Sequence, residues 1–163
     1  MSAAPRILVA GCGNVFLADD AFGVEVATRL QQTDLPEGVV VRDTGIRGVH
    51  LVYELLDGWD TVIIVDASPR GEAPGTVSLI EPDPDADAGD ATLLDAHGMN
   101  PDAVLAMVGI LGGEIGRILV VACEPAEITE RIGLSPVVAG AVDGAVTMVR
   151  DLVGAQVGTG RGS

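Results

Sequence analysis

The sequence predicts an α/β fold, a three-layer α/β/α sandwich around a mixed, mostly parallel five-stranded sheet. Short apolar runs alternate along the 163 residues with segments of helical spacing, which is the pattern of a parallel sheet covered by helices. Aromatic residues make up only 2% of the chain and hydrophobic residues 48%. The core must therefore be filled by Val, Leu, Ile and Ala, which suit buried strands. The length fits one hydrophobic core rather than two.

Five segments are expected to be strands, because each is a short apolar run bounded by glycine, proline or a polar residue. They are residues 6–11, 38–43, 61–66, 76–80 and 117–123. The fourth follows the third too closely for a crossover helix, which takes about a dozen residues. We therefore expect the fourth strand to run antiparallel to the third, as its neighbour.

Helices are expected between these strands. Asp19 is placed as the N-cap of the first helix, and residues 49–56 form a second, short helix. Asn100 caps a third helix, which has proline at its first position. Ser135 and the proline after it open a long last helix. The residues form one domain over 1–153, and the glycine-rich tail over 154–163 is expected to be disordered.

The charge of the chain excludes some classes of partner. Nine basic residues, all arginine, stand against 24 acidic ones, giving a formal charge of −15. Such a field repels a phosphate backbone, so we expect no nucleic-acid partner. No apolar run approaches the ~18 residues needed to cross a bilayer, and the N-terminus lacks the pattern of a secretion signal. We expect a cytoplasmic protein without membrane contact, in which Cys12 and Cys123 form neither a metal motif nor a disulfide framework.

Three polar side chains are expected at the edge where the parallel strands end. Asp20 follows the first strand, Asp66 ends the third, and His97 precedes the helix capped by Asn100. In open α/β sheets ligands bind outside the carboxyl ends of the strands, so we expect these groups to converge at the surface. Two carboxylates and an imidazole suit a divalent ion such as zinc, nickel or cobalt, with positions left open for water or substrate.

Each of the three residues also has a purely structural interpretation. Asp20 could be a first-turn acid favoured by the helix dipole. Asp66 could be a turn former at the strand end, and His97 an incidental loop residue. Their joint placement is what favours a metal site.

The glycine loop after the first strand invites a nucleotide-binding interpretation. Gly11, Gly13 and Asn14 resemble the opening of a dinucleotide fingerprint, but Phe16 stands where a third glycine would be needed. The absence of lysine excludes the phosphate-binding loop of nucleotide hydrolases. We instead expect a tight turn that swings the following acidic pair back over the strand ends. A serine or cysteine nucleophile is not favoured either, because neither residue type stands in a nucleophile-elbow pattern.

Four segments resemble the nickel–iron hydrogenase maturation endopeptidases. They are GCGNVFLADDAFG (residues 11–23), VDASPRG (65–71), DAHGMNP (95–101) and IGLSPVV (132–138). The similarity extends from about residue 6 to about residue 150. The first segment is the most specific, because it joins GxGN to an acidic pair at fixed spacing.

The resemblance implies a phosphorylase/hydrolase-like fold and an aspartyl-type protease. Such enzymes remove a C-terminal extension from the hydrogenase large-subunit precursor after nickel insertion. The family's metal-contacting positions correspond to Asp20, Asp66 and His97, with nickel carried by the substrate and zinc or cadmium as possible ions in the isolated protein. Asp19 is a secondary candidate for a supporting acid or base. Asp43 departs from the family pattern, since threonine rather than glycine follows it.

Two other functions remain open from the sequence. A non-catalytic metal-binding maturation chaperone could use the same fold, since fold does not determine function. A nucleotide-binding protein is the second alternative.

Overall fold

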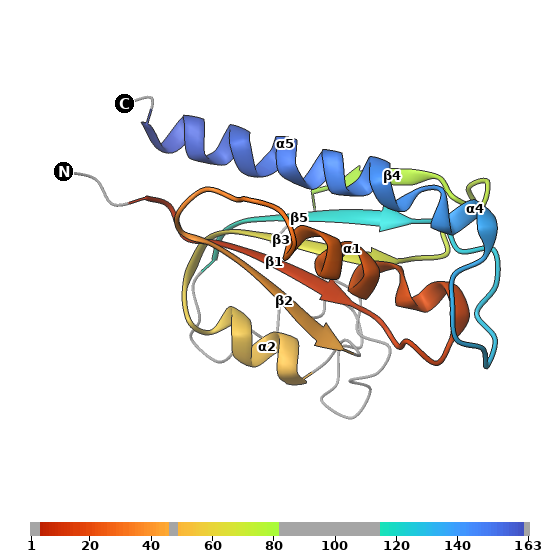
Figure 1. Cartoon of the computed structure of the whole chain (residues 1–163). Coiled ribbons are helices and arrows are strands. Elements are labelled where there is room, and N and C mark those ends of the chain that lie inside the picture. The colour runs from red at the N-terminus through yellow and green to blue at the C-terminus, as the bar shows by residue number, and fades with distance from the viewer. Residues whose placement is uncertain (1–3, 46–48, 82–114, 162–163) are drawn as a thin grey trace.

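The computed structural model describes residues 4–45, 49–81 and 115–161, and its centre is one five-stranded sheet (Figure 1). The strands lie in the order β2-β1-β3-β5-β4, and all pairs are parallel except β4 with β5. The bounds are Ile7–Cys12 for β1, Val39–Gly45 for β2, Trp59–Ala67 for β3, Val77–Ile80 for β4 and Ile115–Cys123 for β5. The expected mixed, mostly parallel sheet is confirmed.

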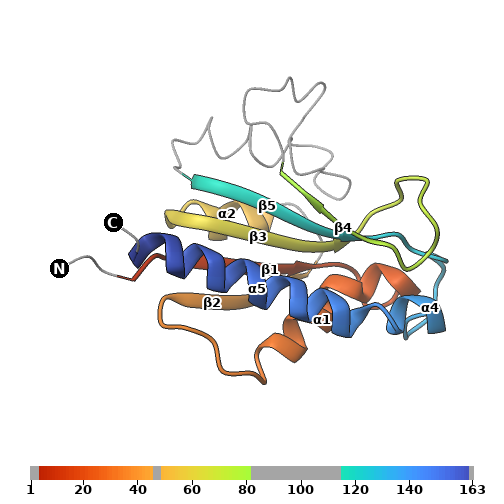
Figure 2. The same ribbon diagram turned by 90° about the horizontal axis from the view of Figure 1, so that it is seen from above.

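Helices cover both faces of the sheet, as the edge-on view shows (Figure 2). The chain forms a 3₁₀ turn η1 at Ala18–Ala21, then α1 at Phe22–Leu30, α2 at Val49–Leu55, α4 at Pro136–Ala139 and α5 at Val142–Arg161. Helices α1 and α5 pack on one face and α2 on the other. This arrangement confirms the three expected layers.

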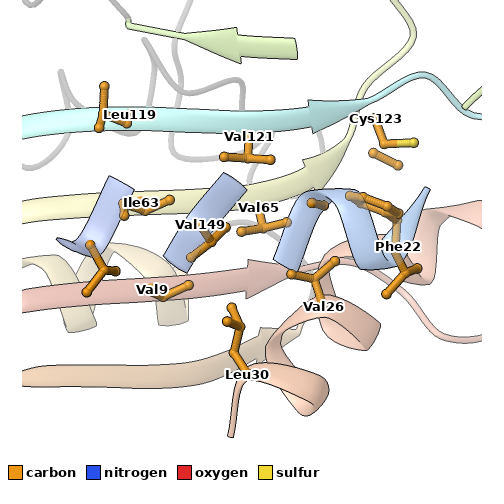
Figure 3. Close-up of a cluster of buried hydrophobic side chains, with 14 of the residues drawn as sticks. Val9, Phe22, Val26, Leu30, Ile63, Val65, Leu119, Val121, Cys123 and Val149 are labelled. Atoms are coloured by element: carbon orange, nitrogen blue, oxygen red, sulfur yellow. The ribbon is translucent and has the colours of Figure 1, made fainter. Parts of the chain in front are cut away.

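The core is aliphatic because both faces of the central strands are buried. On the α1 and α5 side, Val9, Ile63 and Val121 from three adjacent strands meet Val26 and Val149 from the two helices (Figure 3). Burying such a side chain stabilises a fold by about 1.5–3 kcal/mol. The alternate strand residues bury against α2 on the other face. This double burial explains why the strands read as continuous apolar runs in the sequence.

The position of β4 corrects one sequence expectation. β4 is antiparallel and no helix precedes it, as predicted, but its neighbour is β5 rather than β3. The physical reason lies in burial. Every residue from Ile118 to Cys123 of β5 is at most 6% exposed, so this strand needs neighbours on both sides, whereas β4 is only partly buried and suits the edge.

The helices differ from expectation at two points. Asp19 is not an N-cap, because η1 begins at Ala18 and no side chain caps η1 or α1. The last helix is interrupted at Gly140 and then continues to Arg161, through the segment expected to be a disordered tail. Val157 packs against the core there. The helix predicted after Asn100 lies outside the described residues.

The order of the strands creates a crevice at one edge of the sheet. From β1 the chain moves to β2 on one side and returns to β3 on the other. The loops that follow β1 and β3 therefore diverge at their carboxyl ends, where ligands bind in open α/β sheets. None of the helices in the three described ranges is long and apolar enough to cross a membrane.

Candidate functional site

The loop after β1 folds back tightly and places Asp20 over the strand ends. Gly13 has a φ of +151°, and a Cβ on it would lie 1.9 Å from the backbone oxygen of Asp20. Only glycine accommodates both constraints. The backbone N–H of Asn14 donates a 2.8 Å hydrogen bond to Oδ2 of Asp20. The predicted turn is thus present, and its glycine serves a close chain approach rather than a phosphate.

The segment carrying Asp20 adjoins the end of β3, where Asp66 lies. Helix α1 begins directly after η1, and a Cβ on Gly23 in its first turn would stand 2.1 Å from the backbone oxygen of Val65. η1 itself contacts β3. Asp66 is only 3% exposed, so it is buried and not on the surface, where we expected it. Two carboxylates from separate elements are therefore held at one edge of the sheet.

Asp19 differs from its neighbour Asp20 in burial and in bonding. Its side chain has no exposed surface. Oδ1 accepts a 2.7 Å bond from the Ser135 N–H, and Oδ2 accepts bonds of 2.8 and 2.9 Å from the N–H groups of Ala126 and Glu127. The Ser135 hydroxyl donates a further 2.9 Å bond to Oδ2. This carboxylate joins η1 to the loop between β5 and α4.

These bonds determine the charge state of Asp19. Burial acts to raise its pKa, but the hydrogen bonds from Ser135, Glu127 and Ala126 together outweigh that effect and hold the pKa below the ordinary value of 3.8. An ionised, fully bonded and inaccessible carboxylate is unsuited to proton transfer with a substrate. The geometry favours a structural role for Asp19 over that of a supporting acid or base.

Glu124, which the sequence analysis did not single out, orders the chain beyond Asp66. It follows β5 and is 8% exposed. Its Oε1 accepts bonds of 2.7 and 2.9 Å from the N–H groups of Arg70 and Glu72. The signal available in the sequence was weak: an acid directly after a buried apolar strand.

The two cysteines are buried, which disfavours a thiol nucleophile, as the sequence indicated. Burial raises the pKa of Cys123 to about 11, helped by the charges of Asp19 and Glu124. A thiol with that pKa is protonated near neutral pH and is a poor nucleophile. Sγ of Cys12 lies 3.2 Å from the Thr44 hydroxyl.

The metal site predicted from Asp20, Asp66 and His97 remains a prediction. His97 lies outside the described residues, and within those residues no cluster of three histidine, cysteine or acidic side chains has the geometry to hold a metal ion. Asp20 and Asp66 both lie at the expected edge of the sheet, and their role as ligands stays a prediction.

A second hollow opens beyond β2, beside the same edge. It has a volume of about 650 Å³ and is lined by Asp43, Tyr53, Glu54 and Asp57 among others. Asp43 forms a local turn there, because its Oδ1 accepts a 2.8 Å bond from the Gly45 N–H. This bond gives Asp43 a structural role in the turn after β2.

Comparison with known proteins shows which family the chain belongs to. Residues 24–152 match the family model described as hydrogenase maturation protease. The chain is 34% identical over 147 residues to a putative hydrogenase maturation protease of Methanocaldococcus jannaschii, covering 88% of this chain and 93% of that one. It is 32% identical over 152 residues to a hydrogenase expression/formation protein of Rhizobium leguminosarum, covering 91% of this chain and 75% of the relative.

Solved structures give the same result. A hydrogenase maturating endopeptidase from Escherichia coli superposes with a TM-score of 0.74 at 29% identity, covering 91% of each chain. A [NiFe] hydrogenase maturation protease from Thermococcus kodakarensis superposes with a TM-score of 0.73 at 25% identity, covering 93% of this chain and 94% of that one. Both superpositions thus cover more than nine tenths of the chain.

Proposed function

Since the chain belongs to the hydrogenase maturation protease family and is therefore a peptidase, we propose that it removes a C-terminal extension from the large-subunit precursor of a nickel–iron hydrogenase. The observation that carries the proposal is the pair Asp20 and Asp66, which two neighbouring segments hold at the carboxyl edge of the sheet. The four segments that resemble the maturation endopeptidases support the same substrate.

Recognition would depend on nickel that the precursor itself carries. Asp20 is only partly exposed, yet among the described residues its Oδ1 accepts no hydrogen bond, while Oδ2 is bonded to Asn14. One oxygen is thus oriented by the glycine loop and the other is available as a ligand. Asp66 and His97 would supply the remaining donor atoms, and carboxylate with imidazole suits nickel. A precursor without nickel would bring no cation to bridge it to these carboxylates.

Hydrolysis needs an activated water at the scissile carbonyl. A carboxylate at this edge could deprotonate that water, or the substrate-borne ion could polarise it. In both routes the burial of Asp66, which is only 3% exposed, matters, because electrostatic interactions are strong where water is largely excluded. Asp66 is therefore the central residue of the proposal.

The experiment compares nickel-loaded and nickel-free precursor as substrates of the purified chain, with the released peptide detected by mass spectrometry. We expect cleavage of the loaded form only. Asp66→Asn and His97→Ala should abolish cleavage, whereas Asp34→Asn, at an exposed position away from the crevice, should leave it unchanged. Equal cleavage of both precursors would refute nickel recognition. Binding of loaded precursor without any cleavage would favour a metal-binding chaperone instead.

A further inference from the structure

We propose that an apolar groove beside the crevice binds an apolar segment of the precursor polypeptide adjoining the scissile bond, an inference that rests on the proposed function. The groove has a volume of about 420 Å³. It lies between the loop after β1, the start of α1 and the loop that leads into α4. Its apolar lining includes Val15, Ile132, Leu134 and Val142.

The surface around this groove is unusually apolar for exposed positions. Phe16 is 64% exposed and Ile132 is 75% exposed. The backbone fixes their segments side by side, since Leu17 and Arg131 form a parallel bridge, and the Arg131 N–H donates a 3.1 Å bond to the Phe16 oxygen (Figure 1). Large apolar side chains held in fixed positions at the surface are typical of a protein-binding site.

The groove is continuous with the candidate site. Asn14, whose N–H binds the Asp20 carboxylate, is followed directly by Val15, which lines the groove. Ala21, the residue after Asp20, lines it as well. A polypeptide whose scissile bond lies at Asp20 must continue away from that point, and the groove is the apolar surface that it meets on this side.

The charges at the edge of the groove indicate an apolar occupant rather than an anionic one. Arg29 forms ion pairs with Glu25 and Asp143, and Arg131 forms one with Glu127. Both arginines are thus neutralised by carboxylates of the same chain. The formal charge of −15 also disfavours an acidic segment. Apolar burial is the attraction that this surface offers.

The test measures the kinetics of cleavage of the loaded precursor by Val15→Ser and Ile132→Ser, two exposed apolar residues that line the groove. Leu79→Ser on the edge strand β4 is the matched control, because Leu79 is also a large apolar residue, 48% exposed, away from the groove. We expect KM to rise about tenfold for each groove variant, equivalent to about 1.4 kcal/mol. We expect kcat to stay within about twofold, since uniform binding affects KM alone. The control should match the unmodified chain.

An unchanged KM in both groove variants, with the unmodified chain active, would overturn the proposal while leaving the proposed function intact. Sedimentation provides a second arm: if the unmodified chain is a dimer that Ile132→Ser converts to a monomer, the occupant is a second copy and the proposal is wrong. An unmodified chain that fails to cleave the loaded precursor would instead overturn the proposed function, and the groove proposal with it.

Discussion

Replacing Asp19 by asparagine tests whether Asp19, unlike its neighbour Asp20, stabilises the fold. Asparagine has nearly the same shape as aspartate but lacks its charge and one of its two acceptor oxygens. Asp19 accepts hydrogen bonds on both oxygens from the loop between β5 and α4, with donors at Ala126, Glu127 and Ser135. The substitution therefore removes the charge and one acceptor oxygen without leaving a cavity.

The expected loss of stability follows from these bonds. A hydrogen bond to a charged group contributes about 1.5–3 kcal/mol and a neutral one about 0.5–1.5. In its best orientation the amide oxygen replaces Oδ2, and each bond to it weakens by roughly 1 kcal/mol. The amide NH₂ then faces the Ser135 N–H, and leaving that buried donor unsatisfied costs about 1–3 kcal/mol. Relief from burying a charge offsets part of this, so we expect a net loss on the order of 3 kcal/mol.

Urea unfolding, monitored by the fluorescence of the buried and sole tryptophan Trp59, measures the loss. The effect has a defined pH dependence. Because the pKa of Asp19 is lower in the folded chain than its ordinary value of 3.8, its contribution is complete well above that value. The contribution is lost as the pH falls through the still lower folded pKa. The difference between the unmodified chain and Asp19→Asn should be constant near neutrality and shrink below about pH 4.

Asp20→Asn is the matched control. Asp20 is partly exposed and its Oδ2 accepts one bond, from Asn14, which an amide oxygen can replace. We expect it to change the free energy of unfolding by less than about 1 kcal/mol. The structural role assigned to Asp19 is refuted if, at pH 7, the free energy of unfolding of Asp19→Asn lies within about 0.5 kcal/mol of that of the unmodified chain. It is also refuted if Asp20→Asn lowers the free energy of unfolding as much as Asp19→Asn does.

Three further outcomes are expected. Gly13→Ala should lower the free energy of unfolding by at least about 2 kcal/mol and abolish cleavage, because its Cβ would lie 1.9 Å from the Asp20 oxygen; equal urea midpoints would contradict this. Cys123, with its pKa raised to about 11, should resist alkylation at pH 8 until the chain is denatured, as peptide mass spectrometry can show. Glu124→Ala should speed tryptic cleavage after Arg70, because the N–H groups of Arg70 and Glu72 lose their acceptor; unchanged digestion would argue against that role.

Much of the sheet could be predicted from the sequence because its central strands are buried on both faces. Continuous apolar runs such as residues 61–66 and 117–123 are explained by that burial alone. The edge position of β4 could not be predicted in the same way. A short connection fixes the direction of a strand, but which strand becomes its neighbour depends on β5, which comes later in the chain and inserts beside β3.

The end of the last helix shows a limit of compositional reasoning. Glycines from Gly154 onward indicated a flexible tail, yet α5 continues to Arg161. Glycine weakens a helix by only about 1 kcal/mol per residue, and packing of Val153 and Val157 against the core offsets part of that cost. Tertiary contacts here override local propensity.

The positions of the candidate acids along the sheet were predictable, whereas their bonding and burial were not. Asp20 and Asp66 were placed at the correct edge because strand ends and chain order define that edge. The sequence does not, however, distinguish the structural roles of two adjacent acidic residues. Asp19 was taken for a helix cap because its true donors lie 107 to 116 residues further along. Glu124 was missed for the same reason, since its bonds reach back 52 to 54 residues.

The bond between Asp19 and Ser135 also has a consequence for biosynthesis. Asp19 leaves the ribosome early, whereas Ser135 lies 116 residues later. A nascent chain therefore carries the acidic pair long before the partner that fixes the first acid exists. Contacts of such long sequence separation form late in folding. The crevice should consequently take its final form only when translation is well past Ser135. An incomplete chain would therefore lack peptidase activity.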